Sequence, residues 1–234
     1  MRHAPDYAMD DRDAVRALVR ENPWATLVSH VPGRGLVASH YPVLVEDDAD
    51  GLSLVSHVGR PDEALHELGR HEAMIVVSGP SGYISPSWYD VSPAVPTWNF
   101  VVAHLHGTPE ILSDDENLAV LDRLVTHFEA PLPNPFLMHR SLENTAYAKR
   151  IVHGTVGFRL RVTRFEAKQK LSQDKPDEVV DRVIAALRAP GPYENPALAD
   201  RMDAIRRAPA DPTASPPPAP ADRADAGDDR EERR

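Results

Sequence analysis

The chain has 234 residues, of which 41% are hydrophobic and 26% charged, and its formal net charge is -10. This composition is ordinary for a globular protein large enough to bury a core without staples, and the acidic charge argues against non-specific binding of nucleic acid. Cysteine is absent, which excludes disulfides, thiolate metal sites and a cysteine nucleophile.

The sequence favours a cytoplasmic location. No stretch approaches the roughly 18 apolar residues that a membrane-spanning helix needs, so no membrane span is expected. Residues 1–10 are polar and lack the apolar segment of a signal peptide. The absence of cysteine fits a reducing compartment.

The first half of the chain is predicted to be rich in strands. A helix over residues 10–20 places Val15, Leu18 and Val19 on one face. Turn residues at 32–35 and a polar hairpin connection at 47–51 separate apolar, extended segments. We expect a short helix over residues 61–70 and strands over residues 25–31, 36–46, 52–57, 73–78, 83–88 and 99–107.

The second half is predicted to be mainly helical, with one clear strand. That strand covers residues 157–165, where Phe158, Leu160 and Val162 alternate with polar side chains. The apolar residues elsewhere recur at helical spacing. We expect helices over residues 114–128, 142–150, 177–187 and 195–206.

Consecutive strands joined by tight turns indicate a mainly β fold with peripheral helices, an antiparallel barrel rather than a doubly wound sheet. We expect one domain over residues 1–207. Residues 208–234 contain six prolines and no aromatic or large aliphatic side chain, so they are predicted to form a disordered tail. The tail holds seven acidic and four basic residues, which leaves the body with a charge of about -7.

Aromatic and hydroxyl side chains are concentrated between residues 79 and 99. Tyr83, Trp88 and Trp98 offer flat faces that can stack on a planar ligand while their polar edges form hydrogen bonds. Ser85 and Asn99 add polar groups to the same stretch. By composition alone, the commoner role of such aromatics is to fill the barrel, and both interpretations stay open.

Two further segments have the chemistry of an anion site. Ser56, His57 and Arg60 run from a strand into a helix, where free backbone N–H groups and a guanidinium attract a phosphate. Residues 170–173, Lys-Leu-Ser-Gln, place a cation, a hydroxyl and an amide at a strand end. The alternative for the second segment is a solvated loop. Neither a Gly-x-Gly-x-x-Gly motif nor a Walker-type loop is present, which argues against dinucleotide and nucleoside triphosphate folds.

The histidines do not indicate a metal site. His104 and His106 lie on one face of a predicted strand, but no third ligand stands at a diagnostic spacing. Half-buried strand histidines are the favoured interpretation. A serine hydrolase is not supported either, because a Gly-x-Ser-x-Gly elbow is absent. No catalytic residue can be identified by spacing, although His104, His106 or Tyr89 could deliver a proton.

Several long motifs occur in a characteristic order. Gly-Pro-x-x-Tyr-Ile-Ser-Pro-x-Trp-Tyr occupies residues 79–89, Pro-Thr-Trp-Asn occupies 96–99, and Lys-Leu-Ser-Gln occupies 170–173. With Asn-Pro-Trp-Ala-Thr-Leu at 22–27, they make residues 1–187 resemble the PaiB family of FMN-binding negative transcriptional regulators. The chain departs from the family pattern at Phe100, at Asp174 and at residues 61–65. In that last segment Asp62 and Glu63 would disfavour a phosphate unless they point away.

The resemblance implies a pyridoxamine-phosphate-oxidase-like FMN-binding split β-barrel. It also implies a homodimer with FMN at the interface, so that both subunits contribute to the groove. Carried over by motif, the phosphate would lie near Ser56, His57 and Arg60. The flavin groove would be lined by Tyr83, Ser85, Trp88, Trp98 and Asn99, and closed by Lys170, Ser172 and Gln173.

The resemblance leaves the function open. A transcriptional regulator is one candidate, but no helix-turn-helix with a basic recognition helix is visible, which argues against direct DNA binding. An FMN-dependent oxidoreductase acting on a small molecule, or a haem-degrading variant of the fold, is another. A flavin carrier or sensor without turnover is a third. The one basic cluster worth considering is expected to be a solvated face and comprises Arg182, Arg188, Arg201, Arg206 and Arg207.

Overall fold

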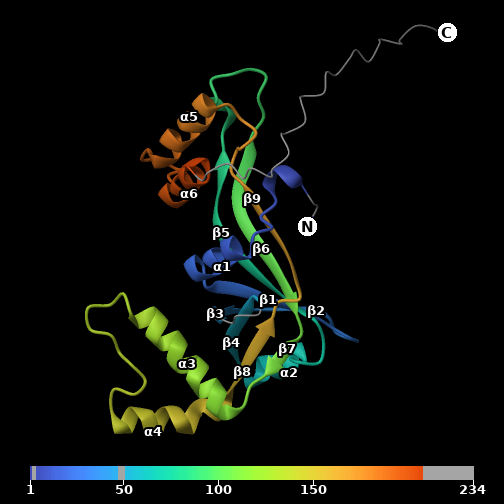
Figure 1. Cartoon of the computed structure of the whole chain (residues 1–234), viewed down its shortest axis with the longest axis vertical. Coiled ribbons are helices and arrows are strands. Elements are labelled where there is room, and N and C mark those ends of the chain that lie inside the picture. The colour runs from blue at the N-terminus through green and yellow to red at the C-terminus, as the bar shows by residue number, and fades with distance from the viewer. Residues whose placement is uncertain (2–3, 47–50, 208–234) are drawn as a thin grey trace, which may run out of the picture.

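The computed structural model describes residues 1, 4–46 and 51–207, which form two antiparallel sheets with helices around them (Figure 1). The predicted mainly β split barrel with peripheral helices is therefore confirmed. The predicted tail over residues 208–234, and all but the last residue of the predicted connection at 47–51, lie outside the described residues.

The larger sheet has the strand order β2-β1-β5-β6-β9 and the smaller one the order β3-β4-β8-β7. Every pair of neighbouring strands is antiparallel. The strands of the larger sheet are β1 (Trp24–Val31), β2 (Gly35–Pro42), β5 (Ala73–Ile84), β6 (Thr97–Gly107) and β9 (Arg164–Lys170). Those of the smaller sheet are β3 (Leu44–Glu46), β4 (Ser53–Gly59), β7 (Pro109–Ile111) and β8 (Thr155–Arg161).

Side-chain caps mark the starts of α1 and α3. The Asp11 side chain accepts hydrogen bonds from two backbone amides of α1, and Ser113 and Glu116 form a capping box at the start of α3. The helices are α1 (Arg12–Glu21), α2 (Arg60–His66), α3 (Asp114–Glu129), α4 (Leu142–Ile151), α5 (Asp177–Arg188) and α6 (Pro196–Arg207). Short 3-10 turns cover Pro5–Tyr7, Pro86–Trp88 and Val152–Gly154.

Two predicted strands are in fact divided between the sheets. Residues 36–46 break at Val43 into β2 and β3, and residues 157–165 break into β8 and β9. At the second break, Val162 donates its amide to Leu52 beside the smaller sheet, whereas Thr163 donates to His106 in the larger one. The single-strand predictions were wrong because the chain stays extended on both sides of each break, and residue type does not say which sheet an extended segment joins.

The predicted separate strand over residues 83–88 is also wrong. Tyr83 is part of β5, which continues through a register shift between Ser78 and Ser81 and ends at Ile84. The strand stops because Pro86 lacks an amide donor and begins a 3-10 turn. Trp88 therefore lies in that turn, close to the end of the strand rather than within it.

The core lies between the two sheets and continues under the last two helices. Leu54, Ile75, Leu105 and Phe158 are almost completely buried in it. Side chains of α5 and α6, among them Leu198, belong to the same apolar cluster. The predicted single domain over residues 1–207 is compatible with this continuity and stays a prediction.

The two faces of the larger sheet differ. On β1, over residues 73–77 of β5 and over residues 99–107 of β6, every second side chain is buried, and the intervening ones point to the opposite face. That second face, called the outer face below, is only half-buried, although Val28, Met74, Val76 and Val102 are apolar. The sheet is extended by the long β5–β6 hairpin, with α5 and α6 beside its tip and α3 and α4 at the other end of the molecule (Figure 1).

A pair of leucine substitutions measures whether α6 unfolds together with the barrel. Leu198→Ala removes a side chain with 0% exposure, and we expect it to lower the free energy of unfolding by about 2–5 kcal/mol. The control Leu142→Ala, at a helical residue that is 91% exposed, should change it by no more than about 0.5 kcal/mol. Urea denaturation followed by circular dichroism makes the comparison. Two separate transitions, or no effect of Leu198→Ala, would contradict a shared core.

Candidate functional site

Four aromatic side chains meet at the tip of the β5–β6 hairpin. Tyr83 on β5 stands directly opposite Trp98 on β6, and their rings meet edge to face with centroids 6.4 Å apart. Tyr193, from the connection between α5 and α6, lies 5.3 Å from the ring of Tyr83 and 6.1 Å from that of Trp88. In this aromatic cluster Trp98 is 58% and Tyr193 50% exposed, whereas Tyr83 and Trp88 are half-buried and Trp88 packs against the core. Packing in the barrel, the alternative left open above, is therefore not the role of Trp98.

The motif at residues 96–99 and the motif at residues 170–173 are joined by direct hydrogen bonds. Asn99 is fully buried, and its Nδ2 donates to Oγ of Ser172 at 2.9 Å while that hydroxyl donates to Asn99 Oδ1 at 3.2 Å. Ser172 has a φ of 65°, a region that residues other than glycine seldom adopt. The reciprocal bonds hold this turn against the end of β6. Asn99 and Ser172 thus join β6 to the segment after β9 from inside the protein.

The other residues predicted for the flavin groove lie nearby and have different roles. Lys170 pairs with Phe100 in the sheet, and its ammonium group donates to the Thr97 hydroxyl. The Gln173 side chain closes the turn, accepting from the Leu171 amide and donating to the Gln169 carbonyl. The hydroxyl of Ser85 caps the 3-10 turn that carries Trp88. The structure therefore brings together all eight residues predicted to line or close the flavin groove, from Tyr83 to Gln173.

The predicted phosphate residues lie on the smaller sheet. The Ser56 hydroxyl is fully buried and donates to the Pro42 carbonyl at 2.6 Å. Nδ1 of His57 is buried and has no hydrogen-bond partner among the described residues. Burial lowers the pKa of His57, because desolvation disfavours the charged ring. His57 therefore presents a neutral ring with an unsatisfied nitrogen.

Arg60 and the acidic residues that follow it are engaged with one another. Nη1 of Arg60 pairs with Glu63 at 3.2 Å, and its Nε donates to the His153 carbonyl at 2.9 Å. Asp62 instead accepts the Tyr41 hydroxyl at 2.6 Å, and this bond holds the pKa of the carboxyl below its usual value. Asp62 is thus tied to β2, whereas Glu63 competes with any anion for Arg60.

The two groups of predicted residues are far apart in a single chain. Ser56, His57 and Arg60 belong to the smaller sheet and α2, whereas the aromatic cluster lies at the tip of the hairpin on the larger sheet. Figure 1 shows α2 and β4 toward one end of the long axis and α5 and α6 toward the other. One chain therefore does not assemble a complete groove from the predicted residues.

The candidate proton donors are placed differently. Tyr89 is only 3% exposed, and its hydroxyl is buried without a partner among the described residues. His104 and His106 lie on the outer face, and burial lowers the pKa of both. His104 stands opposite Glu166 in the sheet. None of the three lies within the aromatic cluster.

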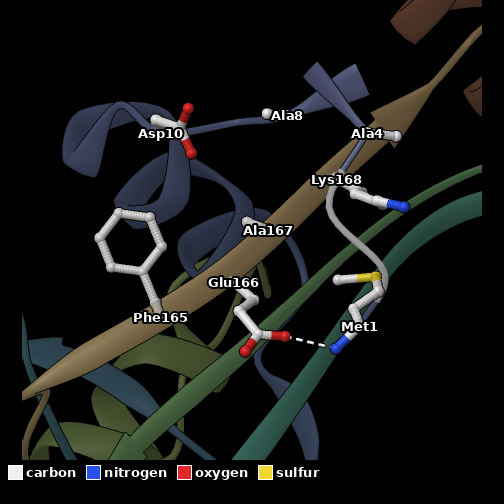
Figure 2. A pocket seen from close by; sticks show the side chains of 8 residues that line it. All are labelled: Met1, Ala4, Ala8, Asp10, Phe165, Glu166, Ala167 and Lys168. Carbon is white, nitrogen blue, oxygen red and sulfur yellow. Dashed lines mark hydrogen bonds and ion pairs between the residues drawn. The ribbon is translucent and has the colours of Figure 1, made fainter. Parts of the chain in front are cut away.

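A hollow lies on the larger sheet beside the N-terminus. It measures about 200 Å³ and is shown in Figure 2, where the ammonium group of Met1 contacts Glu166 at 2.5 Å. Phe165 and Lys168 also line it. This ion pair ties Met1 to β9, and an isolated β-bridge pairs Ala8 with Lys168 of the same strand.

Two residues that sequence reasoning missed organise the site. Tyr193 completes the aromatic cluster, but it lies outside every motif discussed above and only its aromatic character could have marked it. His66, 1% exposed, bonds Ser29 at 2.9 Å and Ser39 at 3.0 Å and so fastens α2 to β1 and β2. Within residues 1, 4–46 and 51–207, no group of three or more potential metal ligands occurs, and no helix has the length and apolarity to cross a bilayer.

Comparison with known proteins adds sequence and fold relatives. The family described as "Putative FMN-binding domain" matches residues 1–164. The Bacillus subtilis (strain 168) protein named "Protease synthase and sporulation protein PAI 2" is 28% identical over 184 residues, which cover 78% of this chain and 86% of that protein.

Two solved structures share the fold. The FAD and heme binding protein from Mycobacterium smegmatis has a TM-score of 0.52 at 19% identity, covering 74% of this chain and 78% of that one. The flavocytochrome Anf3 from Azotobacter vinelandii has a TM-score of 0.52 at 16% identity, covering 74% of each chain. At these identities the likeness concerns the fold alone.

The buried pair of Asn99 and Ser172 should be important for stability. Asn99→Ala leaves the Ser172 hydroxyl without its partner in an apolar surrounding, and we expect a loss of about 1–3 kcal/mol in the free energy of unfolding. Asn134→Ala, at an exposed residue between α3 and α4, serves as the control and should be neutral. Chemical denaturation of both variants tests this. Equal stability of the two would show that the reciprocal bonds contribute nothing.

Proposed function

The chain belongs to the FMN-binding domain family that matches residues 1–164, and from this membership we propose that it binds FMN between two copies of itself. Its cofactor is FMN, and it is a split-barrel protein resembling the PaiB-type regulators. In the proposed homodimer, Tyr83, Trp88 and Trp98 of one chain face the isoalloxazine ring system. The Ser56, His57 and Arg60 segment of the other chain receives the phosphate. The separation of these two groups in one chain is the observation that carries the proposal.

The side chains present suit the two ends of FMN. Exposed aromatic rings such as Trp98 give a planar ligand faces on which to stack. At the other end, the half-exposed guanidinium of Arg60 supplies donors for phosphate oxygens. Binding there requires the anion to displace Glu63 from Arg60, because both compete for the same guanidinium. Asn99 and Ser172 act by holding the wall of the groove rather than by contacting the flavin.

The outer face of the larger sheet is the proposed surface of contact between the two copies. It is half-buried and apolar at Val28, Met74, Val76 and Val102. Polar side chains such as Thr26 and His104 pair with Val76 on the same face, which gives the mixed composition common in interfaces between proteins. A two-fold axis through this face would bury it against itself. We further propose that the protein acts in the cytoplasm, in keeping with its lack of cysteine.

The helices at the C-terminal end argue for regulation through a ligand or partner rather than through direct DNA contact. Arg188 pairs with Asp200 and Asp203, and Arg206 pairs with Asp177 and Asp181. With Arg207, which lies 3.7 Å from Asp203, three of the five arginines of the cluster pair with acids of the same two helices. The helices α5 and α6 therefore present mixed charge where DNA binding would need a basic surface.

A flavin-dependent oxidoreductase is the second candidate. Bound FMN would supply the redox chemistry, and the chain would supply binding, orientation and a place for the substrate. The observation that favours this candidate is a hollow of about 360 Å³ beside Tyr83 and Trp98, a size suited to a small molecule.

FMN binding through aromatic stacking can be measured directly. Fluorescence titration of FMN should give a saturable quench with the wild-type chain, and Trp98→Ala should weaken binding by about tenfold, since base-sized rings gain about 1–3 kcal/mol by stacking. Phe136→Ala, which removes another half-exposed aromatic, is the control and should not change the affinity. Unchanged affinity in Trp98→Ala would remove Trp98 from the site.

The proposed contact surface predicts a coupled loss of assembly and cofactor. In light scattering the wild-type chain should have about twice the 25.8 kDa mass of one copy. Val102→Asp places a charge within the apolar outer face, so it should yield monomers. The same variant should bind FMN at least about tenfold more weakly. Leu142→Asp, on the exposed face of α4, should leave both properties intact. A monomeric variant with full FMN affinity would contradict a groove shared by two chains.

Burial of His57 predicts a pH dependence of stability. Its pKa is lowered in the folded chain from the ordinary 6.5, so the unfolded chain binds the proton more readily. Neutral His57 therefore costs no stability above about pH 6.5, and the free energy of unfolding falls as the pH drops below that value, because the unfolded chain takes up the proton first. Urea midpoints at about pH 7.5 and 5.5 should differ less in His57→Gln than in the wild type or in His139→Gln, an exposed control. An unchanged difference in His57→Gln would contradict this assignment.

A further inference from the structure

The hollow at the tip of the hairpin has a wall that lies outside the part matched by the family. It is lined by Tyr83 and Trp98 from the hairpin and by Pro192, Tyr193, Glu194 and Asn195 from the connection between α5 and α6. The family match ends at residue 164. The ring of Tyr193 is thus an addition that this chain's last two helices bring to the exposed edge of the proposed flavin groove.

Hydrogen bonds and close packing fix the position of Tyr193. Nδ2 of Asn195 donates to the Ser81 carbonyl at 2.9 Å, and Oδ1 of Asn195 caps α6 by accepting from the Leu198 amide at 3.1 Å. A Cβ at Gly82 would stand 3.0 Å from Leu198 and 3.2 Å from Asn195, so the glycine permits this close approach of α6. The connection is fastened to β5 through Asn195, and Tyr193 is held beside Tyr83 while half of its surface stays exposed.

The charge of the hollow restricts what can enter it. Glu194 is the single ionisable acid or base among the eight lining residues apart from the two tyrosines. The other polar groups of the lining are hydroxyls and the Asn195 amide. Aromatic faces attract cations and planar rings, whereas a nearby carboxylate repels an anion.

We propose that Tyr193, Tyr83 and Trp98 form a subsite for a planar aromatic ring that is uncharged or positively charged, next to the flavin. This inference rests on the proposed function, because it supplies the substrate class of the same groove. Tyr193 supplies a stacking face, and Glu194 disfavours anionic rings and favours cationic ones. A volume of about 360 Å³ accommodates one or two fused rings with small substituents.

Three rings of equal size and different charge test the proposal. Nicotinamide is neutral, 1-methylnicotinamide is cationic and nicotinate is anionic at neutral pH. Ligand-observed NMR titration of the full chain, with and without FMN, should give the tightest binding for 1-methylnicotinamide and at least fivefold weaker binding for nicotinate than for nicotinamide. Glu194→Gln should abolish the preference for the cation and leave the affinity for nicotinamide within twofold.

Variants at Tyr193 locate the binding. Tyr193→Ala should weaken nicotinamide and 1-methylnicotinamide at least tenfold, and Tyr193→Phe should restore both to within twofold, since the ring and not the hydroxyl makes the contact. Tyr147→Ala, at a tyrosine of α4 with 51% exposure against 50% for Tyr193, is the matched control and should bind as the wild type does. All three variants should keep the wild-type affinity for FMN.

The outcomes separate this inference from the proposed function. A chain that binds FMN but none of the three rings, or whose ring binding survives Tyr193→Ala, overturns the inference alone. So does equal binding of nicotinate and 1-methylnicotinamide, or loss of FMN in Tyr193→Ala, which would place the tyrosine in the cofactor site. A chain that shows the predicted ring preferences but no FMN binding overturns the proposed function and leaves the subsite standing.

Discussion

The antiparallel pairing of β5 with β6 is the interaction on which the rest of the structure depends. It runs from Ala73 opposite Gly107 at the base to Ile84 opposite Thr97 at the tip. Because paired side chains of neighbouring strands share a face, the base delivers Ile75 and Leu105 to the core while the tip sets Tyr83 against Trp98. One ladder therefore fixes both the stability of the barrel and the geometry of the aromatic cluster. The register shift between Ser78 and Ser81 lies between these two regions.

The same hairpin underlies the proposal of a second copy. The strand pair carries its tip away from the smaller sheet and α2, where His57 and Arg60 lie. It also leaves an outer face that one chain covers only partly. In the proposed homodimer, burying that face against a symmetric copy would gain hydrophobic free energy, and the groove would take its phosphate residues from the second chain. Stability of the assembly and completeness of the groove would then follow from one packing event.

The sequence was informative where a local signal existed. Most helices and the antiparallel, mainly β architecture followed from periodicity and turn residues, and the motifs correctly grouped Trp98, Asn99 and Lys170 with Tyr83. Periodicity could not reveal the transfers between sheets at Val43 and Val162, because the chain stays extended on both sides and residue type does not say which sheet a strand joins. It could not separate the inward role of Asn99 from the outward one of Trp98 without the strand's orientation. Tyr193 was missed because its importance depends on how α6 docks against Gly82, which is a tertiary property.

Mixed dimers test the central claim, a groove built from two chains, most directly. One tagged chain would carry His57→Ala with Arg60→Ala, and the other Tyr83→Ala with Trp98→Ala, so that neither homodimer has an intact groove. If each groove combines the two chains, the purified mixed dimer has one groove with both sets of changes and one with none. It should then bind FMN at half the wild-type stoichiometry and with wild-type affinity. If the mixed dimer binds no better than either parent, each groove lies within one chain and the account is wrong.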